Sequence, residues 1–459
     1  MLKYSSYKNS SYDWLGQIPA HWKENFLEQT ASEKCVKNIG GTVKQVLSLS
    51  YGEIKKKSDL NKGLIAQDLS TYQIIEPDDI IMRLTDLQND HKSLRTGLVN
   101  DNGIITAAYL CLVPRMNSGY LHYLLHAYDV QKVFYGMGGG VRQSIGFKDI
   151  RHMYIPVPPR AEQDQIVRFL DWKVSEINKL IGIRRKEIQG LEEMKSLIIN
   201  TAVTKGITKS CTKSSNVPWI GEIPVDWEII PLKRCLKNIT DVDHYMPPSV
   251  AHGIPYIMTG DLKEKVSEIN FDNCKRISEQ DYKVLSKKSK AQHGDIVFAR
   301  YATIGTVSYV DEDRDFIVSY SCVILKPDSS MIDGRYLFYY LKSRSFSEDV
   351  RQYIKINTQG NVGIDSLKRT VLTRPSIDEQ YMIVQCLDTK CKKIDELIRL
   401  KQSQVQAYQE LKSVIISDAV TGKIDVRNIT VPEYEHVDDI ADDDAEDSDE
   451  KIEEMDEEA

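Results

Sequence analysis

The sequence lacks the short patterns that mark several kinds of chemistry. Its eight cysteines form no Cys-x-x-Cys pair and have no histidine partner at zinc-finger spacing, so they predict neither a zinc site nor a disulfide framework. No Gly-x-x-x-x-Gly-Lys-Ser/Thr phosphate loop is present, and neither Pro-Pro pair has the flanking residues of an adenine methyltransferase loop. We therefore expect no catalytic residue, no metal and no bound cofactor in this chain.

Long apolar stretches are also missing. The first residues, MLKYSSYKNSSYDW, do not follow the pattern of a signal peptide, and no run approaches the length of a membrane-spanning helix. The sequence thus predicts a cytoplasmic protein without a membrane partner.

Basic and acidic residues are unevenly distributed. Residues 431–459 hold sixteen acidic side chains and one lysine, a charge of −15 within a total of −7, so the first 430 residues carry +8. A basic body is compatible with a polyanionic partner. The composition of the tail predicts disorder over 425–459, and mimicry of phosphates at a basic cleft is the alternative.

What the sequence does contain is a duplicated set of phrases. WLGQIPAHW at 14–22 recurs as WIGEIPVDW at 219–227, and PPRAEQDQIVRFLD at 158–171 recurs as PSIDEQYMIVQCLD at 375–388. The two copies of the second motif lie 217 positions apart. The same separation relates EEMKSLIINTAVTKGI at 192–207 to QELKSVIISDAVTGKI at 409–424. Repeat units of this length are far too long for a solenoid. We therefore predict a twofold tandem repeat.

Each repeat ends in a segment of helical periodicity. No proline interrupts 161–203 or 378–420, and apolar residues return there every three or four positions, as in the a/d seam of a coiled coil. Basic residues interrupt the seam, where they either reach solvent or fix an antiparallel register. They are Arg184, Lys195, Lys401 and Lys412. We expect two long helices, 159–206 and 375–424, buried against each other.

The rest of each repeat has the pattern of a globular block of strands. Short alternating or apolar runs lie at 42–50, 78–84 and 103–113 in one block and at 254–260, 294–301 and 316–327 in the other. Helical stretches follow at 119–135 and 334–354. The predicted fold is α/β (α+β), with two globular domains, 4–158 and 207–374, separated by two antiparallel coiled-coil helices in a pseudo-twofold tandem repeat.

Together, the WxGxIPxxW phrase, the PxxxEQxxIVxxLD helix start and their duplication resemble the specificity subunit of type I restriction-modification systems. The resemblance covers about residues 4–424 and leaves out the acidic tail. It implies that each globular block is a target recognition domain that reads one half of a bipartite asymmetric sequence in double-stranded DNA.

The resemblance also implies partners. The helices would bind two modification subunits, which methylate adenine with S-adenosylmethionine, and restriction subunits would supply translocation and cleavage with ATP and Mg. The chain would then be a non-catalytic prokaryotic DNA-binding scaffold. The alternatives are an enzyme with an unrecognised site and a coiled-coil adaptor that does not bind DNA.

Candidates for DNA contact lie in basic or glycine-containing segments of the two blocks. Lysine neutralises phosphates, whereas Arg, Gln and Asn form paired hydrogen bonds with base edges, and a solvated surface charge is the alternative for each candidate. The first block offers Lys55, Lys56, Lys57, Arg83, Lys92, Arg95, Arg142 and Gln143. The second offers Lys287, Lys288, Lys290, Arg300, Tyr301, Asn357, Thr358, Gln359 and Asn361.

The duplicated phrases themselves favour a structural role. We expect Trp14, Trp22, Trp219 and Trp227 to pack in the core and attach each block to the helices, in preference to stacking on bases. The first-turn pairs Glu162 with Gln163 and Glu379 with Gln380 suit the positive end of a helix dipole, and contact with the modification subunit is the alternative.

Overall fold

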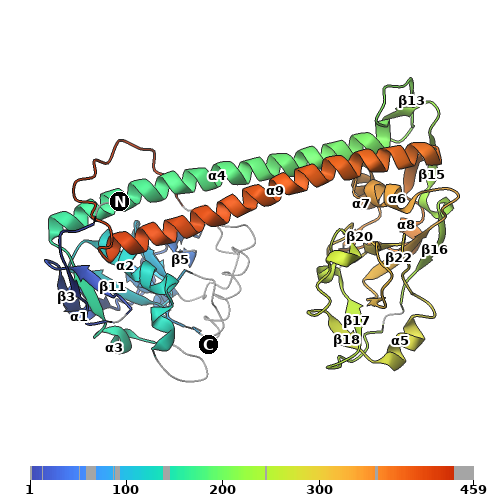
Figure 1. Cartoon of the computed structure of the whole chain (residues 1–459). Coiled ribbons are helices and arrows are strands. Elements are labelled where there is room, and N and C mark those ends of the chain that lie inside the picture. Colours follow the sequence, from blue (N-terminus) through green and yellow to red (C-terminus); the bar gives the residue numbers. More distant parts are fainter. Residues whose placement is uncertain are drawn as a thin grey trace. The chain divides into compact units, whose positions relative to one another are not determined.

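The computed structural model describes residues 3–12, 14–50, 52–57, 69–85, 87, 94–137, 145–242, 245–356 and 360–438. The chain divides into two compact units: unit 1 consists of Met1–Lys186 and Gln402–Ala459, and unit 2 of Glu187–Lys401. Two long helices, α4 (Arg160–Lys205) and α9 (Ile377–Val420), each contribute one part to either unit (Figure 1). Within the described ranges, no helix is long and apolar enough to cross a membrane.

Unit 1 is built on a six-stranded sheet of order β4-β11-β8-β9-β6-β5, which is antiparallel except between β6 and β9. Because side chains alternate along a strand, Ile80 and Met82 of β8 face the main core with α2, while Ile81 faces a second cluster. The strands are β1 (Tyr7–Asn9), β2 (Gln17–Pro19), β3 (Lys23–Phe26), β4 (Ala31–Lys34), β5 (Leu47–Ser50), β6 (Glu53–Lys56), β7 (Gln73–Ile75), β8 (Ile80–Met82), β9 (Thr96–Leu98), β10 (Gly103–Ile105), β11 (Leu110–Pro114) and β12 (Tyr154–Val157). The shorter helices are α1 (Leu27–Thr30), α2 (Ser118–Val130) and α3 (Phe147–Ile150).

Unit 2 has a four-stranded sheet of order β16-β22-β19-β20 with a core on each face. Ile296 and Phe298 of β19 face α6 and the long helices, whereas Val297 faces an outer layer that includes Leu262 and Val266. The strands are β13 (Thr212–Ser214), β14 (Glu222–Pro224), β15 (Glu228–Pro231), β16 (Leu236–Thr240), β17 (Ile254–Ile257), β18 (Lys275–Ile277), β19 (Ile296–Ala299), β20 (Val307–Tyr309), β21 (Ile317–Val318), β22 (Cys322–Pro327), β23 (Lys355–Ile356), β24 (Gly360–Asn361) and β25 (Val371–Arg374). The shorter helices are α5 (Glu279–Leu285), α6 (Gly334–Leu341), α7 (Arg344–Arg351) and α8 (Ile364–Leu367).

One helical stretch differs from its sequence pattern. The segment 334–354 was expected to form a single helix, but it forms α6 and α7, because the Ser343 side chain accepts a hydrogen bond from the Phe346 N–H and starts a new helix. Helices α2 and α6 start in the same way in the two units, because the side chain of Asn117 caps α2 and that of Asp333 caps α6.

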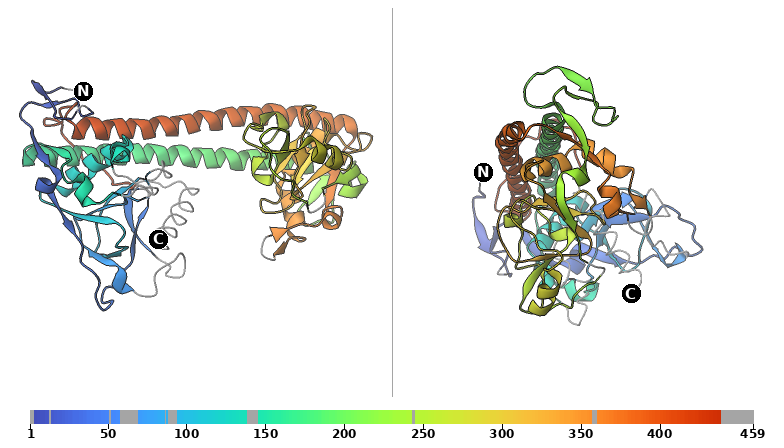
Figure 2. Two further views of the ribbon diagram at one scale, coloured as in Figure 1. Left: turned by 90° about the horizontal axis from the view of Figure 1, so that it is seen from below. Right: turned by 90° about the vertical axis from the view of Figure 1, so that its right-hand side faces the viewer.

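The long helices run antiparallel within unit 2. Lys195 of α4 pairs with Asp395 of α9 at 2.7 Å, and Glu187 pairs with Lys401 at 3.0 Å, so positions rise on one helix as they fall on the other. In unit 1, the Lys412 Nζ lies 3.4 Å from the Asn178 Oδ1. Three of the basic seam residues thus contact the other long helix, as a role in register requires. Figure 2 shows the two helices side by side from further directions.

Candidate functional site

The first tryptophan phrase is fixed to the start of α4. Trp22 is 1% exposed, and its Nε1 donates a hydrogen bond of 2.9 Å to Glu162 Oε1. The Tyr4 hydroxyl donates to the same oxygen at 2.6 Å, and the His21 Nε2 lies 2.9 Å from Oε2. Gly422, just after α9, adopts φ +73, and a Cβ there would lie 2.3 Å from Pro19 Cδ. The phrase therefore holds the start of α4 and the end of α9 together within unit 1.

The second phrase makes the corresponding contacts in unit 2. Trp227 is 1% exposed and donates from Nε1 to Glu379 Oε2 at 2.9 Å, in the first turn of α9. Gly206, which follows α4, has φ +77 and would place a Cβ 3.4 Å from the Trp227 ring. We call these two arrangements, Trp22 with Glu162 and Trp227 with Glu379, the tryptophan anchors.

The glutamines beside the anchors connect each long helix to the next shorter one. Gln163 Oε1 accepts from the Asn117 N–H at 3.0 Å, and Gln380 Oε1 accepts from the Asp333 N–H at 2.7 Å. Each glutamine also donates to the carbonyl five residues earlier, that of Pro158 or Pro375. Glu162, Gln163 and Gln380 are buried, and all four first-turn side chains bond within the chain.

The outer tryptophans of the phrases also pack inside the chain. The Trp14 ring meets Tyr128 edge-on with centroids 4.3 Å apart. Trp219 packs against the main core of unit 2, and its carbonyl accepts a hydrogen bond from the Ser345 hydroxyl. These positions leave the four indoles in packing roles rather than on an open face for stacked bases.

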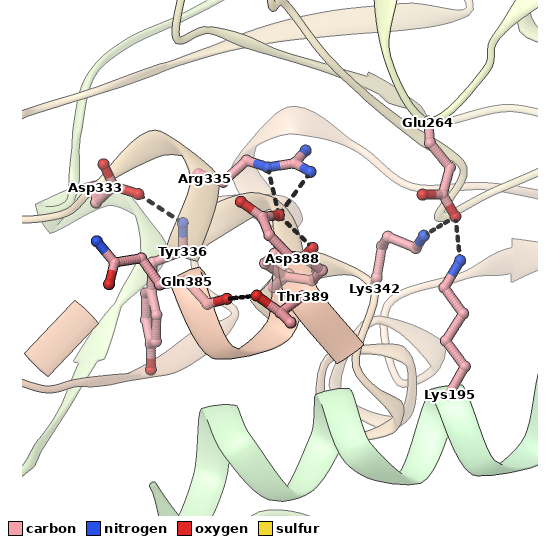
Figure 3. Close-up of polar contacts among 10 residues, drawn as sticks. Lys195, Glu264, Asp333, Arg335, Tyr336, Lys342, Gln385, Asp388 and Thr389 are labelled. Atoms are coloured by element: carbon pink, nitrogen blue, oxygen red, sulfur yellow. Dashed lines mark hydrogen bonds and ion pairs between the residues drawn. The ribbon is translucent and has the colours of Figure 1, made fainter. Parts of the chain in front are cut away.

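Tyrosine hydroxyls add contacts that the sequence pattern did not single out. The Tyr120 hydroxyl donates to the Val420 carbonyl at 2.9 Å, and Tyr336 donates to the Val203 carbonyl at 3.3 Å. Tyr339 donates to Asp388 on α9 at 2.6 Å. Arg335 donates to the same carboxylate at 2.9 Å (Figure 3). The GYLHYLL and GRYLFYYL stretches contained the signal for these tyrosines, since Tyr120 and Tyr336 both stand three residues after the residue that caps their helix, Asn117 or Asp333.

Two of the arginines nominated in unit 1 are interior residues. Arg83 is 1% exposed and Arg95 is fully buried. The Arg95 guanidinium donates to the carbonyls of Arg83 and Thr85, at 3.2 and 2.7 Å. Both side chains are closed off from solvent, and the Arg95 guanidinium stabilises the loop whose carbonyls it binds, so the predicted DNA contacts of Arg83 and Arg95 do not fit this fold.

The lysines of β6 lie at the surface of unit 1. Lys56 is exposed and pairs with Asp101 at 2.8 Å, Lys55 lies 3.7 Å from Glu53, and Lys57 is partly exposed. These three positions stay compatible with phosphate contact. Lys92, Arg142 and Gln143 lie outside the described residues.

The candidates of unit 2 are divided between surface and interior. Lys287 and Lys288 are exposed after α5, and Lys290 pairs with Asp315 at 2.9 Å. Arg300 is buried, where it donates to Asp241 and the Tyr320 carbonyl, so its side chain is not placed for a base edge. Tyr301 and Asn361 are partly exposed and form an antiparallel bridge. Asn357, Thr358 and Gln359 lie outside the described residues.

The possible metal ligands and the thiols of the described residues can be assessed directly. Within these residues, no cluster of three or more His, Cys, Asp or Glu groups could hold a metal ion. All eight cysteines are free, and burial raises the pKa of the Cys111, Cys235 and Cys322 thiols to about 12. Such thiols stay protonated at neutral pH and are poor nucleophiles.

This geometry defines a class of protein with two globular units of mixed helix and sheet. Both units are anchored to the same two long helices. A family model for the type I restriction modification DNA specificity domain matches residues 98–190 and 227–407, more than half of the chain. The chain belongs to this family, whose members are the non-catalytic DNA-recognition components of type I restriction-modification systems.

Relatives and a solved structure agree with this assignment. The chain is 25% identical over 453 residues to a protein of Methanocaldococcus jannaschii named as the specificity subunit of the type I restriction enzyme MjaX, covering 93% of this chain and 99% of that protein. It is 27% identical over 293 residues to the MjaVIII specificity subunit of the same organism, covering 61% and 64%. A chain from a structural study of complex assembly in the type I R-M system shares the fold, with a TM-score of 0.62 at 15% identity and coverage of 89% and 99%.

Proposed function

We propose that this specificity subunit reads a bipartite asymmetric DNA target, with one half-site bound by each unit. The pair of tryptophan anchors is the observation that carries the proposal. Each anchor joins a globular unit to the start of one long helix and the end of the other. If the helices form a continuous antiparallel coiled coil, this arrangement is a pseudo-twofold repeat, in which two similar readers approach opposite strands.

We also propose that α4 and α9 bind two modification subunits and, through the assembly, the restriction subunits. Large apolar side chains that are 38–65% exposed along these helices support this role, since such stripes mark interaction surfaces. They are Leu180, Ile183, Met194, Leu197, Tyr381, Met382, Leu397, Leu400, Leu411 and Val414. S-adenosylmethionine, ATP and Mg would bind the partner subunits, and this chain would hold no cofactor.

The test is a binding and methylation assay with defined subunits. The probe is a duplex whose two half-sites are taken from methylated positions in the source genome. The chain with its methyltransferase should bind this duplex specifically and methylate it, whereas the chain alone with S-adenosylmethionine should transfer no methyl group. Methyl transfer by the chain alone would indicate an enzyme, and a complex without specific DNA binding would indicate an adaptor.

Helix length offers a second test of the bipartite arrangement. Inserting one heptad after Lys186 in α4 and one after Lys401 in α9 preserves the seam and lengthens both helices between the cores of the units. The methylated sequence should keep both half-sites and acquire a longer unread spacer. An unchanged spacer would contradict the proposal that the helices set it.

A further inference from the structure

Four charged side chains connect the outer layer of unit 2 to both long helices. Glu264 Oε1 accepts hydrogen bonds from Lys195 Nζ at 3.0 Å and from Lys342 Nζ (Figure 3). Lys195 also donates to Asp395 at 2.7 Å. Lys195 lies on α4, Asp395 lies on α9, and Lys342 directly follows α6. Glu264 lies between two 3-10 helices, Thr259–Asp261 and Val266–Glu268. We call this group the charge cluster.

The lysines of the charge cluster are shielded, whereas the side chains of Glu264 and Asp395 are 46% and 35% exposed. The side chains of Lys195 and Lys342 are only 13% and 20% exposed. Burial lowers the pKa of Lys342 despite the attraction of Glu264. Burial alone would raise the pKa of Glu264, but the charges and hydrogen bonds of Lys342 and Lys195 outweigh it and lower this pKa to about 2. Two formal positive and two formal negative charges therefore balance, and loss of one leaves a shielded charge unpaired.

Glu264 is rigidly attached to the outer layer. Its carbonyl accepts the Tyr309 N–H of β20 at 2.9 Å, while Leu262 and Val266 on either side are buried in the core of that layer. The same layer contains β17, and β17 and β18 support α5 through Tyr282 and Leu285. The exposed candidates Lys287 and Lys288 directly follow α5. A shift of Glu264 relative to α4 would therefore also shift the surface that carries these lysines.

Unit 1 has a different residue opposite the lysine at the corresponding place. The offset of 217 aligns Lys195 with Lys412 and Asp395 with Asn178, so an amide replaces the carboxylate. The Lys412 Nζ lies 3.4 Å from the Asn178 Oδ1, against 2.7 Å between Lys195 and Asp395. The two repeats therefore differ at this contact, with a carboxylate in unit 2 and an amide in unit 1.

We propose that Glu264 is a positioning residue, which sets the angle of the outer layer of unit 2 to the helices and thereby the spacer length at which its half-site is accepted. This inference rests on the proposed reading of a bipartite target. A carboxylate of the outer layer that bonds to α4 is well placed for this task, because the sheet and α6 lie between the core of that layer and the long helices.

The experiment measures DNA binding by the full chain in complex with its methyltransferase. The probes are the genomic bipartite duplex, the same duplex with a spacer one base pair shorter or longer, and duplexes with one base changed in either half-site. Glu264→Gln removes the charge at constant shape, and Lys195→Met removes its partner. Lys195→Arg keeps the charge, and Glu268→Gln makes the same change in charge at an exposed position of the same segment.

The expected result is a change in spacer discrimination. Glu264→Gln and Lys195→Met should reduce the preference for the native spacer by roughly three- to tenfold, which lies in the lower part of the range of coupling energies between contacting residues. Lys195→Arg and Glu268→Gln should retain it, and the penalties for changed bases should vary by less than about twofold in all variants.

Other outcomes separate the possible failures. An unchanged spacer preference in Glu264→Gln overturns the inference, as does an equal loss of affinity for every duplex, which would indicate a purely structural role. If the unaltered complex shows no preference for the bipartite duplex, the proposed function itself fails.

Discussion

Trp227 donates its indole N–H to the carboxylate of Glu379 over 2.9 Å, which fixes a loop of unit 2 to the first turn of α9. Trp227→Phe keeps an aromatic ring but leaves this carboxylate without the donor. Because Glu379 is only partly buried, water can replace part of this hydrogen bond, and we expect the free energy of unfolding to fall by about 1 kcal/mol.

Unit 1 provides the comparison for this substitution. Glu162 accepts from Tyr4 and contacts His21 in addition to Trp22, so Trp22→Phe should destabilise its unit less than Trp227→Phe destabilises unit 2. Denaturant unfolding followed by hydrogen exchange separates the two units. Equal losses in both variants would show that the additional donors do not compensate.

A matched pair of glycine substitutions tests the closure of unit 1. Gly422 and Gly221 both have φ +73, but a Cβ at Gly422 would lie 2.3 Å from Pro19 Cδ, whereas one at Gly221 would meet nothing within 4 Å. Both alanine variants should lose about 1–2 kcal/mol from backbone strain. Gly422→Ala should lose more because of the collision with Pro19, and thermal unfolding measures the difference. Similar melting temperatures would mean that the turn after α9 adjusts freely.

The charge cluster predicts an acid dependence of stability. Glu264 has a pKa of about 2 in the folded chain against an ordinary value of 4.5. A lowered acid pKa contributes stability that is complete above 4.5 and is lost as the pH falls towards 2. The difference in melting temperature between the natural chain and Glu264→Gln should be constant from pH 7 to 5 and shrink below 4.5. A difference that already shrinks near pH 6 would identify another titrating group.

Surface and interior basic residues should behave differently on substitution. Replacing Lys287 and Lys288 by alanine should weaken binding to all DNA sequences and reduce the slope of log K against log salt by about 1 per lost phosphate contact. Arg95→Ala should lower the melting temperature instead, because its guanidinium holds two carbonyls in the interior. An unchanged salt slope in the lysine variant would remove these lysines from the DNA interface.

Local and long-range features differ in how far the sequence predicts them. Periodicity and the absence of proline were sufficient for α4 and α9, because a long amphipathic helix is determined by its own residues. The Arg95 guanidinium binds carbonyls that only the folded loop brings near it, and no pattern around Arg83 or Arg95 indicates that they are buried. Glu264 meets Lys195 across 69 residues, so composition and spacing contain no signal for the charge cluster.

The start of the acidic tail illustrates the same difference. Disorder was predicted from residue 425, yet the described residues up to Asp438 lie along α4 in unit 1. Gln165 donates to the carbonyls of Val426 and Ile429, and Asn178 donates to that of Val437. These bonds use backbone carbonyls, which every residue possesses, so the composition of the segment could not predict them.

The contact between Gly422 and Pro19 has a consequence for the order in which the protein matures on the ribosome. Unit 2 is one continuous stretch and has all its residues once position 401 has emerged. The first 186 residues of unit 1 cannot complete their fold until the last part of α9 is translated, because Trp22 and Pro19 pack against the turn that follows that helix. The unit whose synthesis begins first therefore completes its fold last. A chain that ends before residue 402 would carry an incompletely folded unit 1 attached to a folded unit 2.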